Sequence, residues 1–201
     1  MSAEGSAQAD GSRVAAPAPA SPRARIARLL RRPEQTLLLA PMATLTHAGL
    51  RVLVESFGGC DLHVSEMISA EALVGGTRYE AWYTATDPDP DRLILQLVGY
   101  STERIVEAAR ILAGTGAAGI DVNMGCSAPH IVRKGGGIAW MDDPDRAVDL
   151  VRGIRSVAGD LSVSVKLRLG SSDDPDRLAD FCRALEAAGT DFVTLHPKRR
   201  K

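Results

Sequence analysis

The sequence predicts an α/β protein, an incomplete TIM (β/α)8 barrel with about six of the eight strands and a disordered N-terminal extension. Short apolar runs begin near residues 36, 61, 92, 119, 161 and 191, and these intervals match one strand–helix unit. Amphipathic stretches lie between the runs. The turn after the first run reads APMATLTHAG, whereas a dinucleotide-binding doubly wound sheet usually has G-x-G-x-x-G there, so the barrel is preferred.

Residues 1–35 form the predicted extension. They are rich in Ala, Pro and Arg, include the stretch VAAPAPASP, and show no sustained hydrophobic period. The later piece RARIARLLRRPEQ could form a short basic helix, either as an RNA-attracting or targeting arm or, as we prefer, as a solvated tail or misassigned start. The apolar segment and cleavage site of a secretory signal are missing.

Residues 36–201 contain the predicted barrel strands. Near-continuous apolar runs are typical of parallel strands that are covered on both faces. In chain order the runs read TLLLAP, DLHVSEM, RLILQLVG, GIDVNMG, LSVSVKLRLG and DFVTLHP. Because a closed barrel takes ~250 residues, we expect a fragment that lacks the seventh and eighth strands.

Helices are predicted between the strands, because apolar residues three or four apart form one face that packs on a sheet. The first set is Leu50, Leu53, Val54 and Phe57; the second is Ala147, Leu150, Val151 and Ile154. A third helix carries Leu178, Phe181 and Leu185, with Asp174 as its N-cap and Pro175 in its first turn.

Composition bounds the class of protein. With 45% hydrophobic residues and a net charge of -1, the chain is typical of a soluble globular protein. No apolar run reaches the ~18 residues that cross a bilayer, so no membrane span is expected. Cys60, Cys126 and Cys182 lack the spacing of a zinc site or disulfide framework, which favours a cytoplasmic setting and no bound metal.

Polar side chains end the predicted strands, and in an α/β barrel the reacting groups gather at those carboxyl ends. The strand ends carry Pro41, Met42, Ala43, Glu66, Gln96, Asn123, Cys126, Lys166, Arg168 and His196. An unpaired ammonium or amide inside an apolar barrel costs several kcal/mol. Lys166 is therefore interpreted as a ligand or catalytic residue, while for Gln96 and His196 a structural role stays equally open.

The segment IDVNMGCSAP followed by IVRKGGGIAW is the sharpest signal. It places Asn123 and Cys126 on the loop after the fourth strand and then returns Lys134 and three glycines toward the same mouth. Glycines let a backbone approach a flat ligand or a phosphate closely. A lone cysteine is more often inert than catalytic, but the neighbouring strand-end groups favour a reactive role.

The motifs APMATLTHAGLR, SEM, QLVG, IDVNMGCSAP and VKLRLG, in this order, resemble those of the tRNA-dihydrouridine synthase family. The resemblance runs from about Leu38 to His196, with Ser127 where the family usually has proline. It implies FMN as cofactor, NADPH as electron donor and tRNA as partner of a protein expected to be monomeric. It also implies that the family's helical tRNA-binding domain is absent.

By this resemblance Cys126 is the proton donor in the reduction of specific uridines to 5,6-dihydrouridine, with the hydride from reduced FMN. The residues expected to hold FMN are Pro41, Met42, Ala43, Gln96, Lys166 and His196. Asn123, Lys134 and Arg168 are expected to meet the tRNA. Two alternatives stay open: another FMN-dependent barrel oxidoreductase acting on a small pyrimidine or enone, and an inactive truncated RNA-binding fragment.

Overall fold

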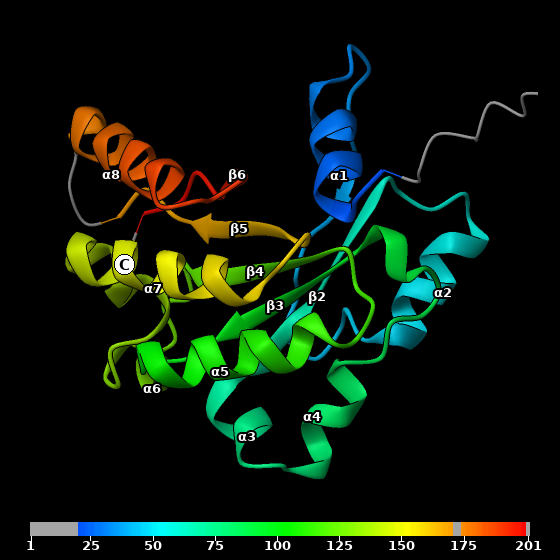
Figure 1. Cartoon of the computed structure of the whole chain (residues 1–201), viewed down its shortest axis with the longest axis horizontal. Coiled ribbons are helices and arrows are strands. Elements are labelled where there is room, and N and C mark those ends of the chain that lie inside the picture. Colours follow the sequence, from blue (N-terminus) through cyan, green and yellow to red (C-terminus); the bar gives the residue numbers. More distant parts are fainter. Residues whose placement is uncertain (1–19, 171–173, 200–201) are drawn as a thin grey trace, which may run out of the picture.

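The computed structural model describes residues 20–170 and 174–199, and it contains a six-stranded sheet in which all neighbouring strands are parallel (Figure 1). The strands are β1 (Leu38–Leu39), β2 (Leu62–Ser69), β3 (Leu93–Val98), β4 (Gly119–Met124), β5 (Ser162–Leu167) and β6 (Phe192–Leu195).

The strands follow one another in space in the order of the sequence. A doubly wound sheet would reverse its strand order at a switch point, so the predicted α/β barrel strands are confirmed. Among the described residues no pairing joins β6 to β1, and the sheet is a half-barrel.

The longest helices cover one side of the sheet. α5 (Thr102–Ala113), α7 (Pro144–Val157) and α8 (Pro175–Ala187) lie beside one another there (Figure 1). The predicted cap of α8 is confirmed, since the Asp174 carboxylate accepts from the Asp176 amide at 2.9 Å. The shorter helices are α2 (Ala48–Ser56), α3 (Ala70–Val74), α4 (Arg78–Tyr83), α6 (Pro129–Val132), η1 (Pro90–Arg92) and η2 (Gly137–Asp142).

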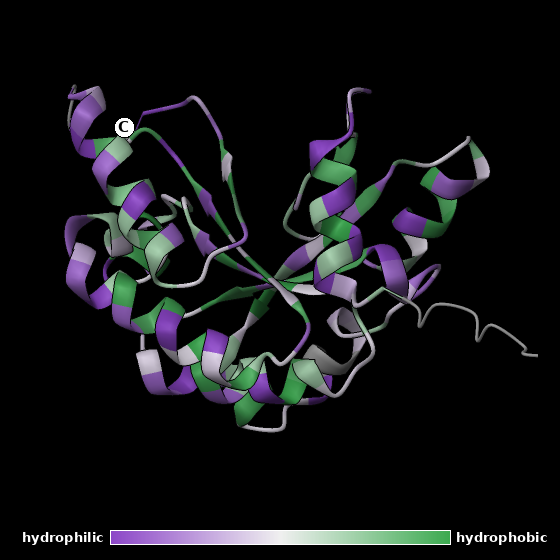
Figure 2. Ribbon diagram, turned by 45° about the horizontal axis from the view of Figure 1, so that its top comes forward, coloured by the Kyte–Doolittle hydropathy of each residue, from purple (hydrophilic) through white to green (hydrophobic). Residues whose placement is uncertain are grey.

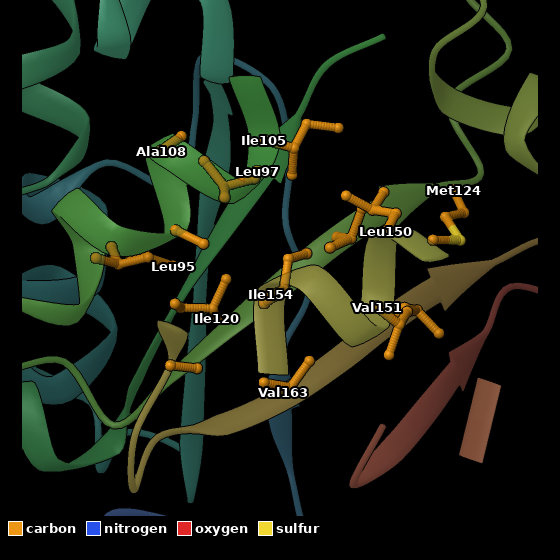
Figure 3. Packing of buried hydrophobic residues seen from close by; sticks show 14 of the residues in the cluster. Leu95, Leu97, Ile105, Ala108, Ile120, Met124, Leu150, Val151, Ile154 and Val163 are labelled. Carbon is orange, nitrogen blue, oxygen red and sulfur yellow. The ribbon is translucent and has the colours of Figure 1, made fainter. Parts of the chain in front are cut away.

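The main core lies between the sheet and these helices. Leu95 of β3 and Ile120 of β4 meet Ala108 of α5 and Ile154 of α7, all of them fully buried (Figure 3). Because side chains alternate along a strand, the residues next to Leu95 and Ile120 face the opposite side of the sheet. That side is the interior of the half-barrel.

Helix α1 (Pro22–Arg31) corrects the predicted extension. Residues 1–19 lie outside the described residues, but residues 20–35 are ordered. Ile26 is 1% exposed and packs in a second cluster with Leu62, Val64 and Ile94. The folded domain therefore begins before residue 36, because one apolar stripe of this arginine-rich segment is buried against the strands. Figure 2 shows hydrophobic and hydrophilic residues alternating along α1.

Three arginines of this segment bind aspartates that precede strands. Arg23 Nε lies 2.7 Å from Asp191 Oδ1, ahead of β6. Arg25 and Arg32 bind the carboxylates of Asp91 and Asp61, ahead of β3 and β2, at 2.5 and 2.6 Å. Since parallel strands all begin at the same end of the barrel, α1 covers the end opposite the strands' carboxyl termini.

Helix α2 differs from the prediction. Its expected inner face exposes Leu53 to 53%, and the following Phe57 is 85% exposed, whereas Arg51 is 1% exposed. The Arg51 guanidinium donates to the carbonyls of Thr46, Ala85 and Asp87 at 2.9, 2.5 and 2.9 Å. These three bonds set the rotation of the helix, so its apolar residues do not all turn inward. No helix in the described part of the chain is both long and apolar enough to cross a membrane.

Candidate active site

A layer of polar side chains crosses the interior of the half-barrel. Gln96 of β3 is in register with Asp121 of β4, and Asp121 is in register with Ser164 of β5. A small cavity of about 70 Å³ is lined by these three residues together with Pro41 and Lys166. The structure thus brings together Pro41, Gln96 and Lys166, three of the residues predicted to bind a cofactor.

The polar layer continues as a hydrogen-bond chain toward Cys126. Asp121 Oδ2 accepts from Gln96 Nε2 at 2.7 Å, and Gln96 Oε1 accepts from Asn123 Nδ2 at 3.0 Å. Asn123 Oδ1 then accepts from the backbone amides of Gly125 and Cys126 at 3.1 and 2.8 Å. Both side-chain amides are buried, and each bonds to protein through its nitrogen and its oxygen, so a structural role is present for Gln96 and for Asn123.

Lys166 and Asp121 affect each other's ionisation. Burial raises the pKa of Asp121 to about 6, against the opposing effects of hydrogen bonds from Ser164 and Gln96 and of the Lys166 charge. Burial lowers the pKa of Lys166, and the Asp121 charge acts in the opposite direction. Lys166 is half-buried, and among the described residues neither a hydrogen bond nor an ion pair within 4.0 Å holds its ammonium. A cation of this kind is poised to meet an acceptor in the barrel mouth.

The Cys126 loop is packed against the glycines that follow it. A Cβ on Gly137, whose φ is 58°, would lie 2.3 Å from the Cys126 carbonyl oxygen, and that oxygen accepts from the Ile138 amide at 2.9 Å. A Cβ on Gly136 would lie 2.7 Å from the Gly99 oxygen. These two glycines were expected to allow close approach of a ligand. In the structure they allow close approach of protein backbone.

Arg146 joins the loops that leave β3 and β4. Its guanidinium lies 3.8 Å from the ring centroid of the buried Trp140, donates to the Gly135 carbonyl at 3.3 Å, and also donates to the Tyr100 carbonyl. The Lys134 ammonium lies 5.3 Å from the Tyr100 ring centroid, a cation–π contact on the exposed rim. Lys134 is thereby attached to the loop after β3.

The loop after β1 has a strained residue. Thr44 has a φ of 63°, a left-handed conformation that is rare for a β-branched residue, and its amide donates to the Glu66 carboxylate. Met42 is 37% exposed and Ala43 is exposed, and neither lines the cavity with Pro41.

Arg168 and His196 flank the mouth from β5 and β6. A Cβ on Gly125 would lie 3.3 Å from Arg168 Cγ, so the Arg168 stem runs beside the Cys126 loop. His196 is exposed, and its backbone amide donates to the Leu167 carbonyl at 2.9 Å. Partial desolvation and the charges of Lys166, Arg168 and Lys198 lower the pKa of His196, which favours the neutral imidazole at pH 7.

A family model for dihydrouridine synthases matches residues 38–201. The chain belongs to the dihydrouridine synthase family. This confirms the resemblance drawn from the strand-end motifs. The part of this family member that the structure describes has no group of three His, Cys, Asp or Glu side chains arranged to hold a metal ion.

Curated relatives agree with this family. The chain is 36% identical over 165 residues to a probable tRNA-dihydrouridine synthase of Rhizobium leguminosarum bv. phaseoli, covering 82% of this chain and 51% of the relative. It is 33% identical over 169 residues to tRNA-dihydrouridine(47) synthase of Malassezia globosa, whose name adds NAD(P)(+), covering 82% and 22%. The chain spans about half the length of the bacterial relative.

The fold is shared with solved α/β structures. A crystal structure of 2,3-dimethylmalate lyase, of the PEP mutase/isocitrate lyase superfamily, superposes with a TM-score of 0.59 at 15% identity. The match covers 88% of this chain and 63% of the other. At this identity it supports the fold alone.

In this member of the family, the most informative residues missed by sequence reasoning are Asp121 and Arg146. Asp121 lies between two residues of a buried apolar strand, and a carboxylate at such a place needs partners. That signal was present in the sequence. Arg146 showed no such signal, because it joins the loop after β4 to Tyr100, which lies 46 positions away.

Proposed function

We propose that this chain is the N-terminal part of the catalytic barrel of an enzyme that reduces uridines in tRNA to 5,6-dihydrouridine. Residues 36–201, with α1 added, would be the flavin-binding unit, and a helical tRNA-binding domain would lie elsewhere in the whole protein. The supporting observation is the position of Cys126. It is half-exposed at the barrel mouth, on a loop held by Asn123 and close to Lys166 and Arg168.

The residues of the mouth fit FMN unevenly. Lys166 fits well, because a half-buried ammonium can meet the electron-rich edge of a flavin. Pro41 lines the same cavity and offers a flat apolar contact. Met42, Ala43 and His196 are exposed and free to approach a ligand, whereas the amide of Gln96 is already engaged with protein. When bound, FMN would supply the hydride to the uracil ring.

The chain's own groups would carry the remaining chemistry. The Cys126 thiol would deliver a proton to C5 of the uracil while the hydride arrives at C6 on the opposite face. Asn123 holds the Cys126 amide and so fixes the place of that proton. Lys166 would stabilise negative charge near the reacting atoms.

The tRNA would be met at the rim. A uridine in folded tRNA has to be splayed out to reach a barrel mouth, which costs a few kcal/mol. Lys134 and Arg168 are the proposed contacts, Lys134 on the exposed rim beside Tyr100 and Arg168 beside the Cys126 loop. NADPH is the proposed electron donor, and the protein is proposed to be a cytoplasmic monomer. The name of the Malassezia globosa relative supports a nicotinamide donor.

The experiment uses the chain of residues 1–201, purified with FMN, NADPH and unmodified tRNA. Flavin absorbance reports cofactor binding, and mass spectrometry of digested tRNA reports uridines that have gained two hydrogen atoms. Cys126→Ala should abolish the reduction and keep the flavin. Cys182→Ala on α8 is the matched control and should keep both.

Each alternative has its own result. Reduction of a free pyrimidine or enone, but not of tRNA, would indicate a different barrel oxidoreductase. Binding of tRNA without flavin would indicate an RNA-binding fragment. Full tRNA reduction by Cys126→Ala would refute the assigned role of the thiol.

A further inference from the structure

We propose that Asp121 is a positioning residue for Cys126, because its carboxylate fixes the direction of the amide hydrogen-bond chain that ends on the Gly125 and Cys126 amides. The chain links Asp121, Gln96 and Asn123 and passes from β4 to β3 and back. The catalytic meaning of this role rests on the proposed function. The role itself concerns only residues of this chain.

The direction follows from which groups can donate. An ionised carboxylate only accepts hydrogen bonds, and a backbone amide only donates them. Asp121 therefore requires the Gln96 side chain to present its NH₂ group, at 2.7 Å. The Gln96 oxygen must then face Asn123, which presents its own NH₂ group at 3.0 Å. That leaves the Asn123 oxygen for the Gly125 and Cys126 amides.

The three side chains of this arrangement are shielded from bulk water. Gln96, Asp121 and Asn123 are 0%, 3% and 8% exposed. If Gln96 turned over, its oxygen would face the carboxylate and its NH₂ group would face the Asn123 NH₂ group. If Asn123 also turned over, its NH₂ group would oppose two backbone N–H groups, and the Cys126 loop would lose its anchor.

The groups around Asp121 support a pH-dependent change in the direction of this hydrogen-bond chain. Ser164 and Lys166 face Asp121 from β5, and Gln96 faces it from β3. Of these three side chains, Lys166 is the charged one. The residues that line the cavity from β1, β2 and β6 are uncharged. Burial raises the pKa of Asp121 to about 6, so the acceptor-only state holds above this pH. A protonated Asp121 can donate, so it no longer requires the Gln96 side chain to present its NH₂ group.

The experiment measures hydrogen exchange of the Gly125 and Cys126 amides by NMR in the ¹⁵N-labelled chain of residues 1–201, without FMN or tRNA. Asp121→Asn keeps the shape and removes the charge. We expect these two amides to exchange about tenfold faster in Asp121→Asn at pH 7.5. Ser164→Ala is the matched control, since it removes a bond at 2.6 Å to Asp121 but leaves the direction of the chain unchanged.

A compensating variant tests direction separately from packing. In Asp121→Asn combined with Gln96→Glu, the carboxylate moves one residue along the chain, and Asn123 must again turn its oxygen to the Cys126 amide. Protection of that amide should return. In the unmodified chain, the Cys126 amide shift should titrate with a midpoint near 6, and Asp121→Asn should abolish that titration.

Equal protection in Asp121→Asn and the unmodified chain would overturn the proposal, as would equal loss of protection in Ser164→Ala. If Asp121→Asn does not fold, the titration of the unmodified chain decides, and a flat Cys126 shift between pH 5 and 7.5 overturns the proposal. Because neither flavin nor tRNA is present, failure of the proposed reductase activity leaves these readouts unchanged.

Discussion

Replacing Arg51 by methionine tests whether this buried guanidinium holds α2 to the segment that precedes β3. The side chain is 1% exposed and donates to the carbonyls of Thr46, Ala85 and Asp87. Burial lowers its pKa and the Asp87 charge opposes that shift, so the cation is held at a cost. Methionine fills a similar volume and leaves three carbonyls without a donor.

The size of the effect follows from these bonds. Each hydrogen bond from a charged donor contributes about 1.5–3 kcal/mol, and part of the sum is offset because a buried charge is removed along with the bonds. We expect Arg51→Met to lower the free energy of unfolding by about 3 kcal/mol and Tm by about 6–12 °C. The free energy of unfolding of Arg51→Lys should lie between those of Arg51→Met and the unmodified chain, because an ammonium cannot reproduce the planar fork of donors.

Urea unfolding followed by circular dichroism measures the change. Arg28→Met is the matched control, because Arg28 is exposed on α1, and it should change the free energy of unfolding by less than about 0.5 kcal/mol. A loss below about 1 kcal/mol in Arg51→Met, or an unchanged Arg51→Lys, would show that the three carbonyls do not depend on the guanidinium.

Three further predictions concern stability. Thr44→Gly should raise the free energy of unfolding by about 1 kcal/mol by relieving the left-handed φ of 63°, while Thr44→Ala should not, and urea unfolding of the pair checks this. Asp121 binds its proton more tightly in the folded state, with a pKa of about 6 against 3.8, so stability should fall by up to about 3 kcal/mol as pH rises between these values. Asp121→Asn should remove this dependence of the free energy of unfolding on pH. If the unmodified chain instead became more stable than the variant as pH rises, the prediction would be wrong. Ile26→Ala should lower the free energy of unfolding by about 3 kcal/mol, whereas the exposed Ala24→Ser should have little effect, and thermal unfolding of both variants measures the difference.

Much of the fold could be predicted because its signals are local. An apolar run covered on both faces, such as that of β4, identifies a strand whatever its partners are. Asp174 and Pro175 likewise define the start of α8 through their own backbone and side-chain geometry. These elements need no knowledge of the rest of the molecule.

The two N-terminal helices could not be predicted in the same way. In α1 the burial of Ile26 depends on a cluster formed by β2, β3 and the start of β4, and the arginines obscure the apolar stripe. In α2 an arginine is the buried residue, and two of its three hydrogen-bond partners, Ala85 and Asp87, lie more than thirty positions away. In both helices, tertiary contacts bury a residue that charge alone, whether its own or that of its neighbours, would place in solvent.

The sequence predicted several residues of the candidate site but not the hydrogen bonds that connect them. Strand ends identified Cys126, Lys166 and Gln96 because parallel strands bring their carboxyl ends together. Asp121 was missed, because it lies inside a strand and not at its end. Its register with Gln96 and Ser164 depends on how three strands align.

The ion pair between Arg23 and Asp191 has a consequence for how the chain folds during synthesis. These residues are 168 positions apart, so α1 leaves the ribosome long before its partner ahead of β6 has been made. Contacts of such sequence separation form late, because a long loop must close first. The apolar side of α1 gains its partners Leu62, Val64 and Ile94 earlier, whereas Arg23 lacks Asp191 until the segment ahead of β6 has been made. The contact between the first helix and the segment ahead of β6 is therefore among the last contacts of these six strands to form.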